Sequence, residues 1–423
     1  MTRGSITVQL LDKLVIDIDP LRTSREFRYI FVARVVSIFG LGFLVVAIPL
    51  QMYDLTRSTA HVAAVATVLG LTTFGATFVG GALADRCDRR RVIAIARGSA
   101  GVFFAVLAVN AFLPEPQVWV IYLCAVVDGA CGGISATALM AVTPSLIPRD
   151  KLAAAGALMA LTADLGSMIG PALGGVVIAL GGVGANYTLA AITTAVTTFC
   201  ITRLPSLPPP TEVSESPLRS VAGGFRFAIG DRVIGGLLLA GFVSMLLAGW
   251  AVLIPEYASE VLGVGPSAVG LLYAAPAIGA VVGSLTSGWT GTVRRSGLVV
   301  FLAMLISAAG LVGAGAMGSV IVAVLGLLAH GFGEAVADIL RFATVQKYTP
   351  DDYHGRIAGV WTAQVTAGAS VGAFVAGVVA AVVPVHLALT VYGATGLVAT
   401  VLLWAILPTL RRLDESRTPT PVA

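Results

Sequence analysis

The chain has 423 residues, of which 57% are hydrophobic and only 11% are charged. Soluble domains carry about 25% charged residues, so this composition excludes an ordinary soluble protein. The formal net charge of +4 does not indicate nucleic-acid binding, because the distribution of the basic residues along the chain explains it.

Apolar stretches of about 20 residues, the length that crosses a bilayer as a helix, recur along the whole chain. We expect an all-α membrane protein with twelve membrane-spanning helices. In the first half the expected spans are 29–53, 61–84, 91–113, 118–143, 152–179 and 184–203. In the second half they are 233–255, 266–290, 297–317, 319–343, 356–383 and 386–407.

The basic residues lie mostly on one side of this topology. Of the 26 Lys and Arg residues, 22 are in the tails and in the alternate loops that share a side with the N-terminus. Only Arg57 lies on the other side, and Arg34, Arg97 and Arg341 fall inside spans. Basic loops remain cytoplasmic. We therefore expect a multi-pass protein of the cytoplasmic (inner) membrane with both termini in the cytoplasm.

A polar segment divides the chain into two halves. It opens with a proline-rich run, 204–210, that cannot continue a helix. Within it, 218–229 is expected to form a short helix at the membrane surface. The expected parts are a cytoplasmic N-terminal segment 1–28, a six-helix bundle 29–203, a cytoplasmic linker 204–232, a second six-helix bundle 233–407 and a cytoplasmic tail 408–423.

The two halves resemble each other. A shift of 202 residues places Gly81, Gly129, Gly166, Gly170 and Gly175 on Gly283, Gly331, Gly368, Gly372 and Gly377. Parallel repeats of six helices are the architecture of transporters that rock two halves around a site near the middle of the membrane. The repeat therefore predicts two pseudo-symmetric bundles and a transport function.

The loop between the second and third spans is short and strongly basic. It reads Gly-Ala-Leu-Ala-Asp-Arg-Cys-Asp-Arg-Arg-Arg over 81–91. Its acidic residues partly offset the arginines, which oppose the dipole at the start of the third helix. A basic loop without a part in transport is the alternative interpretation. The candidate residues of this cytoplasmic loop motif are Gly81, Asp85, Arg86, Arg89 and Arg90.

The fifth span carries a row of glycines. Gly166, Gly170 and Gly174 recur every four residues and are followed by Gly175. Such a row permits close packing of another helix. Pro171 leaves a backbone carbonyl unpaired and permits a bend. The row therefore predicts a close helix contact, whether or not it has a further part in transport.

The tenth span carries several polar residues. His330, Glu334 and Asp338 are four residues apart and share one helix face, while Arg341 is expected to snorkel toward the cytoplasm. We expect this face to line the transport path and carry protons, because charges inside a bilayer are costly and usually face a cavity or a partner. Successive members are about 6 Å apart along the helix, which suits a relay bridged by water or cargo. A local ion pair to a neighbouring helix is the alternative.

Other charges fall inside spans. Asp128 coincides with His330 under the shift, which places both near the middle of the membrane. Arg34 either binds an anionic substrate or pairs with an acid. Asp164 is either a proton site or the partner of a basic group, and Arg97 is interpreted as a snorkelling residue. No metal site or cofactor is expected.

Two of these motifs resemble signatures of the major facilitator superfamily. The basic loop resembles G-x-L-x-D-R-x-G-R-[KR], with Asp88 in place of a glycine. Asp tolerates a left-handed turn, so the loop is expected to keep its shape. The fifth span resembles the G-x-x-x-G-P-x-x-G-G signature of the superfamily's exporters. An arginine usual in the fourth span is missing, because Ala125 stands four residues before Gly129.

Shorter strings resemble one branch, the enterobactin-exporter family. They are Leu113-Pro-Glu-Pro116, Asn186-Tyr187, the run 204–210 and Trp361-Thr-Ala-Gln364. The resemblance implies a secondary transporter that exports a siderophore from the cytoplasm, driven by the proton gradient, with helices 1, 4, 7 and 10 lining the cavity. A proton-driven multidrug efflux pump is the alternative. An enzyme is not expected, because the chain has only four histidines and no H-E-x-x-H motif.

Overall fold

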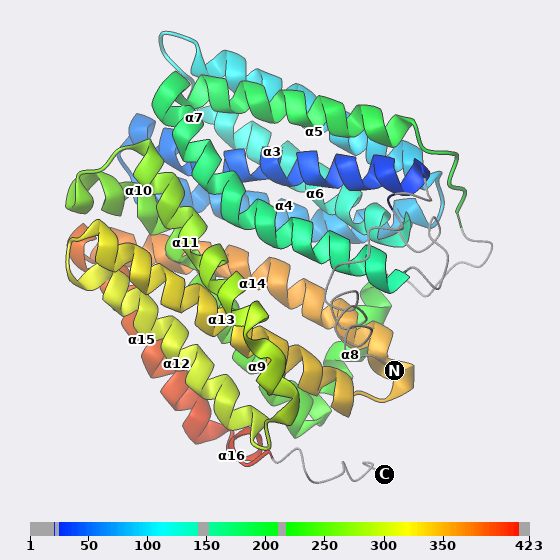
Figure 1. Ribbon diagram of the computed structural model, residues 1–423, viewed down its shortest axis with the longest axis vertical. Coiled ribbons are helices and arrows are strands. Elements are labelled where there is room, and N and C mark those ends of the chain that lie inside the picture. Colours follow the sequence, from blue (N-terminus) through cyan, green and yellow to red (C-terminus); the bar gives the residue numbers. More distant parts are fainter. Residues whose placement is uncertain (1–20, 22–24, 143–151, 210–216, 414–423) are drawn as a thin grey trace, which may run out of the picture.

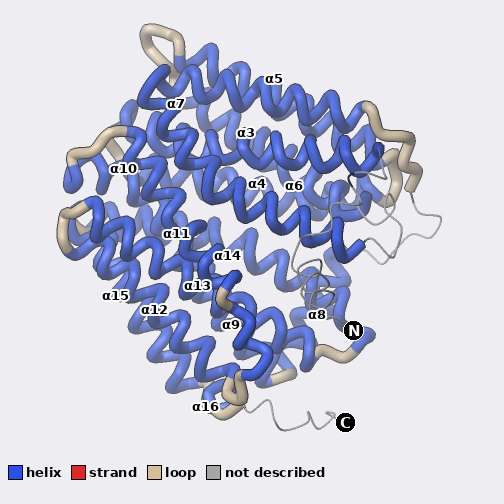
Figure 2. The backbone as a smooth tube through the Cα atoms, in the orientation of Figure 1, coloured by secondary structure: helices blue, strands red, loops and turns tan. Residues whose placement is uncertain are grey.

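The computed structural model describes residues 21, 25–142, 152–209 and 217–413. These residues form helices joined by short connections, and no strand occurs among them (Figure 2). Within this part of the chain, eleven helical segments are long and apolar enough to cross a membrane. The expected all-α membrane fold is confirmed.

The helices of the first half follow the expected spans closely. They are α3 (Arg25–Thr56), α4 (Thr59–Ala84), α5 (Arg89–Ala111), α6 (Val118–Val142) and α7 (Leu152–Thr202). Helix α7 has 51 residues in all; it consists of two helices joined at Gly182 and contains both the fifth and the sixth expected span. Gly182 interrupts it with a φ of 74°. The eleven segments therefore account for twelve crossings.

In the second half the seventh crossing is the least regular. It begins as α9 (Arg232–Leu247), continues as a 3₁₀ helix (Ala248–Leu253) and a short α10 (Ile254–Glu256), and ends in a π-helical turn (Tyr257–Leu262). The remaining helices are α11 (Pro266–Leu285), α12 (Ser296–Ala316), α13 (Val320–Tyr348), α14 (His354–Val382), α15 (Val385–Ile406) and α16 (Pro408–Arg411). Helix α8 (Pro217–Gly230) confirms the helix expected over 218–229.

The row of glycines in α7 brings two helices into backbone contact. A Cβ atom at Gly42 of α3 would lie 2.6 Å from the Cα atom of Gly170. A Cβ atom at Gly174 would lie 3.2 Å from the Cα atom of Phe43. Real Cβ atoms essentially never approach another atom to 2.6 Å and rarely approach one to 3.2 Å, so the predicted close helix contact is confirmed, with α3 as the partner of α7.

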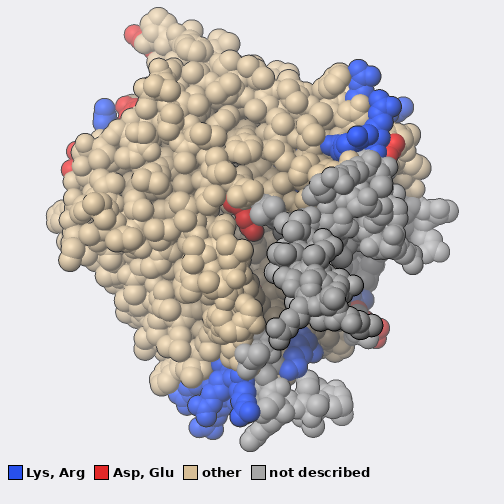
Figure 3. Space-filling model, viewed as in Figure 1, with Lys and Arg blue, Asp and Glu red and all other residues tan. Residues whose placement is uncertain are grey.

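One end of the molecule is rich in basic residues, and we call it the basic end. The loop from Ala84 to Arg89 lies there. Figure 3 shows Lys and Arg side chains gathered at the upper right and at the bottom of the view. Because Thr59 and Ala84 are the two ends of α4, Thr59 marks the opposite end.

The two bundles contact each other at the opposite end. Gly175 of α7 packs against the carbonyl oxygen of Pro266 and against Gly270 of α11. The hydroxyl of Tyr53 in α3 donates to a carboxylate oxygen of Glu260 at 3.3 Å. In Figure 1 the two groups of helices meet at the left and diverge toward the right. The structure therefore has the bundles closed against each other at the end away from the basic loop.

Candidate transport site

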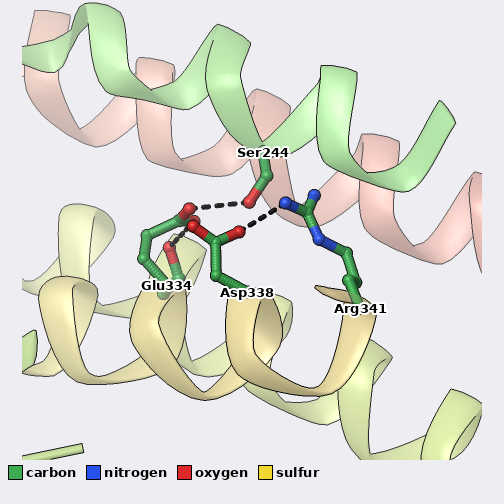
Figure 4. Close-up of polar contacts among 5 residues, drawn as sticks. Ser244, Glu334, Asp338 and Arg341 are labelled. Carbon is green, nitrogen blue, oxygen red and sulfur yellow. Dashed lines mark hydrogen bonds and ion pairs between the residues drawn. The ribbon is translucent and has the colours of Figure 1, made fainter. Parts of the chain in front are cut away.

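Three helices of the second bundle meet around one carboxylate. Glu334 of α13 accepts a hydrogen bond from the hydroxyl of Ser244 in α9 at 2.7 Å and another from the hydroxyl of Ser307 in α12 at 2.8 Å. Figure 4 shows the carboxyl groups of Glu334 and Asp338, the Ser244 hydroxyl and the Arg341 guanidinium directed toward one another between α9 and α13. The polar face expected on the tenth span is therefore one side of a polar cluster.

Ser307 joins two members of that face. Its hydroxyl lies 2.8 Å from Nδ1 of His330 as well as 2.8 Å from Glu334. A hydroxyl has a single hydrogen, so when Ser307 donates to Glu334 it accepts from His330. The expected bridge of water or cargo between these two residues is replaced here by a serine of α12. Nothing in the spacing along α13 could have predicted it.

His330 is enclosed by protein in this structure. Its relative exposure is 3%, and Trp250 packs edge-on against its ring at 5.9 Å between centroids. By contrast, the side chain of Asp338 is 42% exposed. Asp338 is therefore more open to solvent than His330, and the part that any of the three residues takes in transport stays a prediction.

Arg341 does not snorkel, and that expectation was wrong. Its side chain is fully buried and forms an ion pair with Asp338. Its guanidinium carbon lies 5.1 Å from the ring centroid of Trp361 in α14, a cation–π contact. Nε and Nη1 have no hydrogen-bond partner among the described residues. Arg341 thus faces the bundle interior, because Asp338 and Trp361 hold it there.

The first bundle places its charges differently. Arg97 of α5 and Asp128 of α6 are both half-buried and near enough for their opposite charges to interact; the snorkelling of Arg97 stays a prediction. Arg34 is half-buried, and its Nε has no hydrogen-bond partner among the described residues. The side chain of Asp164 is exposed. Its neighbour Ser167 bonds only the backbone carbonyl oxygen of Asp164, at 2.9 Å.

The basic loop is built around Asp88. Its carboxylate accepts hydrogen bonds from the backbone N–H groups of Arg90 at 2.9 Å and Arg91 at 3.3 Å, which caps the start of α5. The hydroxyl of Ser206 also donates to it. The φ of Asp88 is −58°, so the left-handed turn inferred for this position was wrong.

Asp88 also ties the loop to the chain that follows α7. The backbone N–H of Leu207 donates to its carboxylate at 3.4 Å, and the N–H of Arg89 donates to the Leu207 carbonyl at 3.0 Å. Burial alone would raise the pKa of the Asp88 carboxyl, but the hydrogen bonds from Ser206 and the backbone outweigh it and lower that pKa. The other loop-motif residues lie in the same turn: Gly81 and Asp85 at the end of α4, the exposed Arg86, and Arg90 in the first turn of α5.

Comparison with known proteins identifies the family. The sequence model of a family described as transmembrane secretion effector, a branch of the major facilitator superfamily, matches residues 17–421. The chain belongs to this family. It is a membrane transporter and not an enzyme. The matched range includes both bundles, the basic loop and the glycine row.

Relatives within and beyond the family agree with this assignment. The chain is 39% identical over 402 residues to proteins called enterobactin exporter EntS from Shigella boydii serotype 18 and Escherichia coli O81, covering 95% of this chain and 96% of each relative. Among solved structures, the nucleoside transporter NupG aligns with a TM-score of 0.74 at 12% identity, covering 90% of this chain and 100% of that one. The peptide transporter POT aligns with a TM-score of 0.73 at 14% identity, covering 93% and 96%. At such low identities these structures show the fold alone.

Proposed function

We propose that the chain exports a siderophore from the cytoplasm across the cytoplasmic membrane in exchange for protons. The observation that carries this proposal is the 39% identity, sustained over 95% of the chain, to transporters called enterobactin exporters. Similarity along the full length includes both bundles, and in transporters of this kind the cargo site lies between them.

The polar cluster in the second bundle supports the proton part of the proposal. Glu334 and Asp338 are carboxylates inside a membrane-spanning helix. Such groups are retained at a cost of about 2.5–3.5 kcal/mol each on insertion scales and mark ion or substrate pathways. Because Asp338 is partly exposed while Glu334 is hydrogen-bonded to two other helices, proton binding can alter the contacts among three helices of the second bundle.

A deletion strain tests the cargo. Growth without the gene in iron-poor medium should strongly reduce the siderophore outside the cell and raise the amount inside, because the main export path is lost. Normal secretion, together with new sensitivity to several unrelated toxic compounds, would contradict siderophore export and favour a multidrug efflux pump. Complementation with the intact gene should restore secretion.

Cys87 tests the proposed orientation of the membrane protein. It is exposed in the basic loop, whereas Cys124, Cys131 and Cys200 are buried. A membrane-impermeant thiol reagent should leave intact cells unlabelled and should label the protein after permeabilisation, because basic loops face the cytoplasm. The variant Cys87→Ser should remain unlabelled in both cases. Labelling of Cys87 in intact cells would reverse the orientation and with it the proposed direction of transport.

A further inference from the structure

A large cavity lies beside the start of the seventh crossing. Its volume is about 870 Å³, and its walls come from α4, α8, α9, α14 and the end of α15. Nearly all of its lining is apolar, including Phe74 of α4 and Phe242 of α9. Because Phe74 belongs to the first bundle and Phe242 to the second, an occupant of this cavity would contact both.

The rim of the cavity is suited to hydrocarbon. Phe225 and Ile229 of α8 are 58% and 70% exposed, Leu239 of α9 is 45% exposed, and Ile406 of α15 is 68% exposed. All four line the cavity. In a protein that crosses a membrane, such a group of exposed apolar side chains is expected to contact lipid.

Two residues of opposite charge lie at the mouth of the cavity, at the start of α9. Asp231 and Arg232 both line it. Oδ1 of Asp231 caps α9 by accepting from the N–H groups of Val233 and Ile234, each at 2.8 Å. Its second oxygen, Oδ2, accepts no hydrogen bond from the described residues. Arg232 is exposed and forms no ion pair or hydrogen bond with them. The mouth therefore offers one free acceptor and one set of free donors, side by side.

We propose that this cavity binds a phospholipid whose headgroup carries a primary ammonium, with its phosphate on Arg232, its ammonium on Asp231 and one acyl chain along the apolar walls toward Phe74. A guanidinium donates charge-assisted hydrogen bonds to phosphate. A primary ammonium donates hydrogen bonds to a carboxylate, which a quaternary ammonium cannot do. Hence phosphatidylethanolamine can hydrogen-bond to both Arg232 and Asp231. Phosphatidylglycerol can bind only Arg232. Phosphatidylcholine can bind Arg232 through its phosphate but can only attract the charge of Asp231, without a hydrogen bond.

Native mass spectrometry of the full-length protein, exchanged into mixtures of these three lipids, tests the proposal. The unaltered protein should retain one phosphatidylethanolamine about tenfold more often than phosphatidylcholine, a preference typical of one buried charged hydrogen bond. Arg232→Gln should reduce retention of all three lipids, because each would place its phosphate on this residue. Asp231→Asn keeps the helix cap, since asparagine caps helices as well as aspartate does, but it replaces the free oxygen with an amide NH2 group. It should therefore abolish the preference over both phosphatidylglycerol and phosphatidylcholine.

Two further variants keep the test decisive. Ala367→Phe places a ring inside the cavity, which Ala367 lines, and should displace the lipid while leaving the headgroup residues intact. Arg295→Gln removes an exposed charge outside the lining and should retain lipid like the unaltered protein. Equal retention of all three lipids, or retention that none of the cavity variants changes, would overturn the proposal. Displacement of the lipid by a siderophore alone, with no headgroup preference, would do the same.

Discussion

Glu334→Gln is expected to abolish uphill export while leaving downhill movement of the cargo intact. Glutamine has the shape of glutamate, and its Oε1 can accept a hydrogen bond from one of the two hydroxyls that bond Glu334, Ser244 and Ser307, while its Nε2 can donate to the other. It cannot bind or release a proton. If Glu334 exchanges a proton in each cycle, the variant loses the coupling free energy between cargo and protons, and the cargo then only equilibrates to a concentration ratio of about 1.

Inside-out membrane vesicles with an acidic lumen are suited to this measurement, because protons leaving the lumen should drive cargo into it. Asp128→Asn and His330→Gln should be measured beside Glu334→Gln, since either residue is also a candidate proton carrier. Ser307→Ala is the matched structural control. It removes the hydroxyl that joins Glu334 to His330 but leaves both titratable groups, so it should slow accumulation without abolishing it.

If the role of Glu334 is purely structural, Glu334→Gln should give a different result. The variant would then reach the membrane in smaller amounts, and the protein that did insert would pump normally. Normal accumulation by Glu334→Gln, at equal amounts of protein, would show that this carboxylate does not couple protons to the cargo.

Gly175→Val is expected to hold the bundles apart at the end opposite the basic loop. A Cβ atom at Gly175 would lie 2.5 Å from the carbonyl oxygen of Pro266 and 2.8 Å from the Cα atom of Gly270. Both neighbours are backbone atoms of α11, in the other bundle, so no side chain can rotate to make room. Overpacking of this kind costs about 1–3 kcal/mol, about 5- to 150-fold in the ratio of the closed to the open arrangement.

Export by Gly175→Val should therefore fall by a similar factor while the protein remains folded, because each bundle keeps its own core. Distances between spin labels on α7 and α11 at that end should lengthen. Gly75→Val in α4 is the control, since a Cβ atom at Gly75 would meet nothing within 4 Å. Unchanged distances and unchanged export in Gly175→Val would show that closure at Gly175 is not part of the cycle.

Features that depend on a single helix, and not on its neighbours, could be predicted from the sequence. Span positions follow from apolar length, so α12 (Ser296–Ala316) lies within one residue of the expected 297–317 at each end. The glycine row predicted a close contact because the spacing of Gly166, Gly170 and Gly174 is set by the helix itself. The partner, α3, could not be predicted, since it depends on how helices distant in the chain are arranged.

Contacts between helices were the features that the sequence did not reveal. Ser307 and Ser244 are single small residues among many in their spans, and nothing in their spacing indicates that both bond Glu334. The prediction that Arg341 snorkels was based only on its depth in the membrane. Trp361 on α14 and Asp338 one turn away hold the guanidinium inside, and only the packing of α13 against α14 reveals this.

Uptake of siderophore into inside-out vesicles, with and without an imposed pH gradient, tests most directly that the chain is a proton-coupled siderophore exporter. With an acidic lumen the siderophore should accumulate above its outside concentration, and a protonophore should release it to equilibrium. Vesicles without the protein should show neither effect. Uptake that is independent of the pH gradient and insensitive to the protonophore would contradict proton coupling, and no uptake by well-folded protein would contradict siderophore export itself.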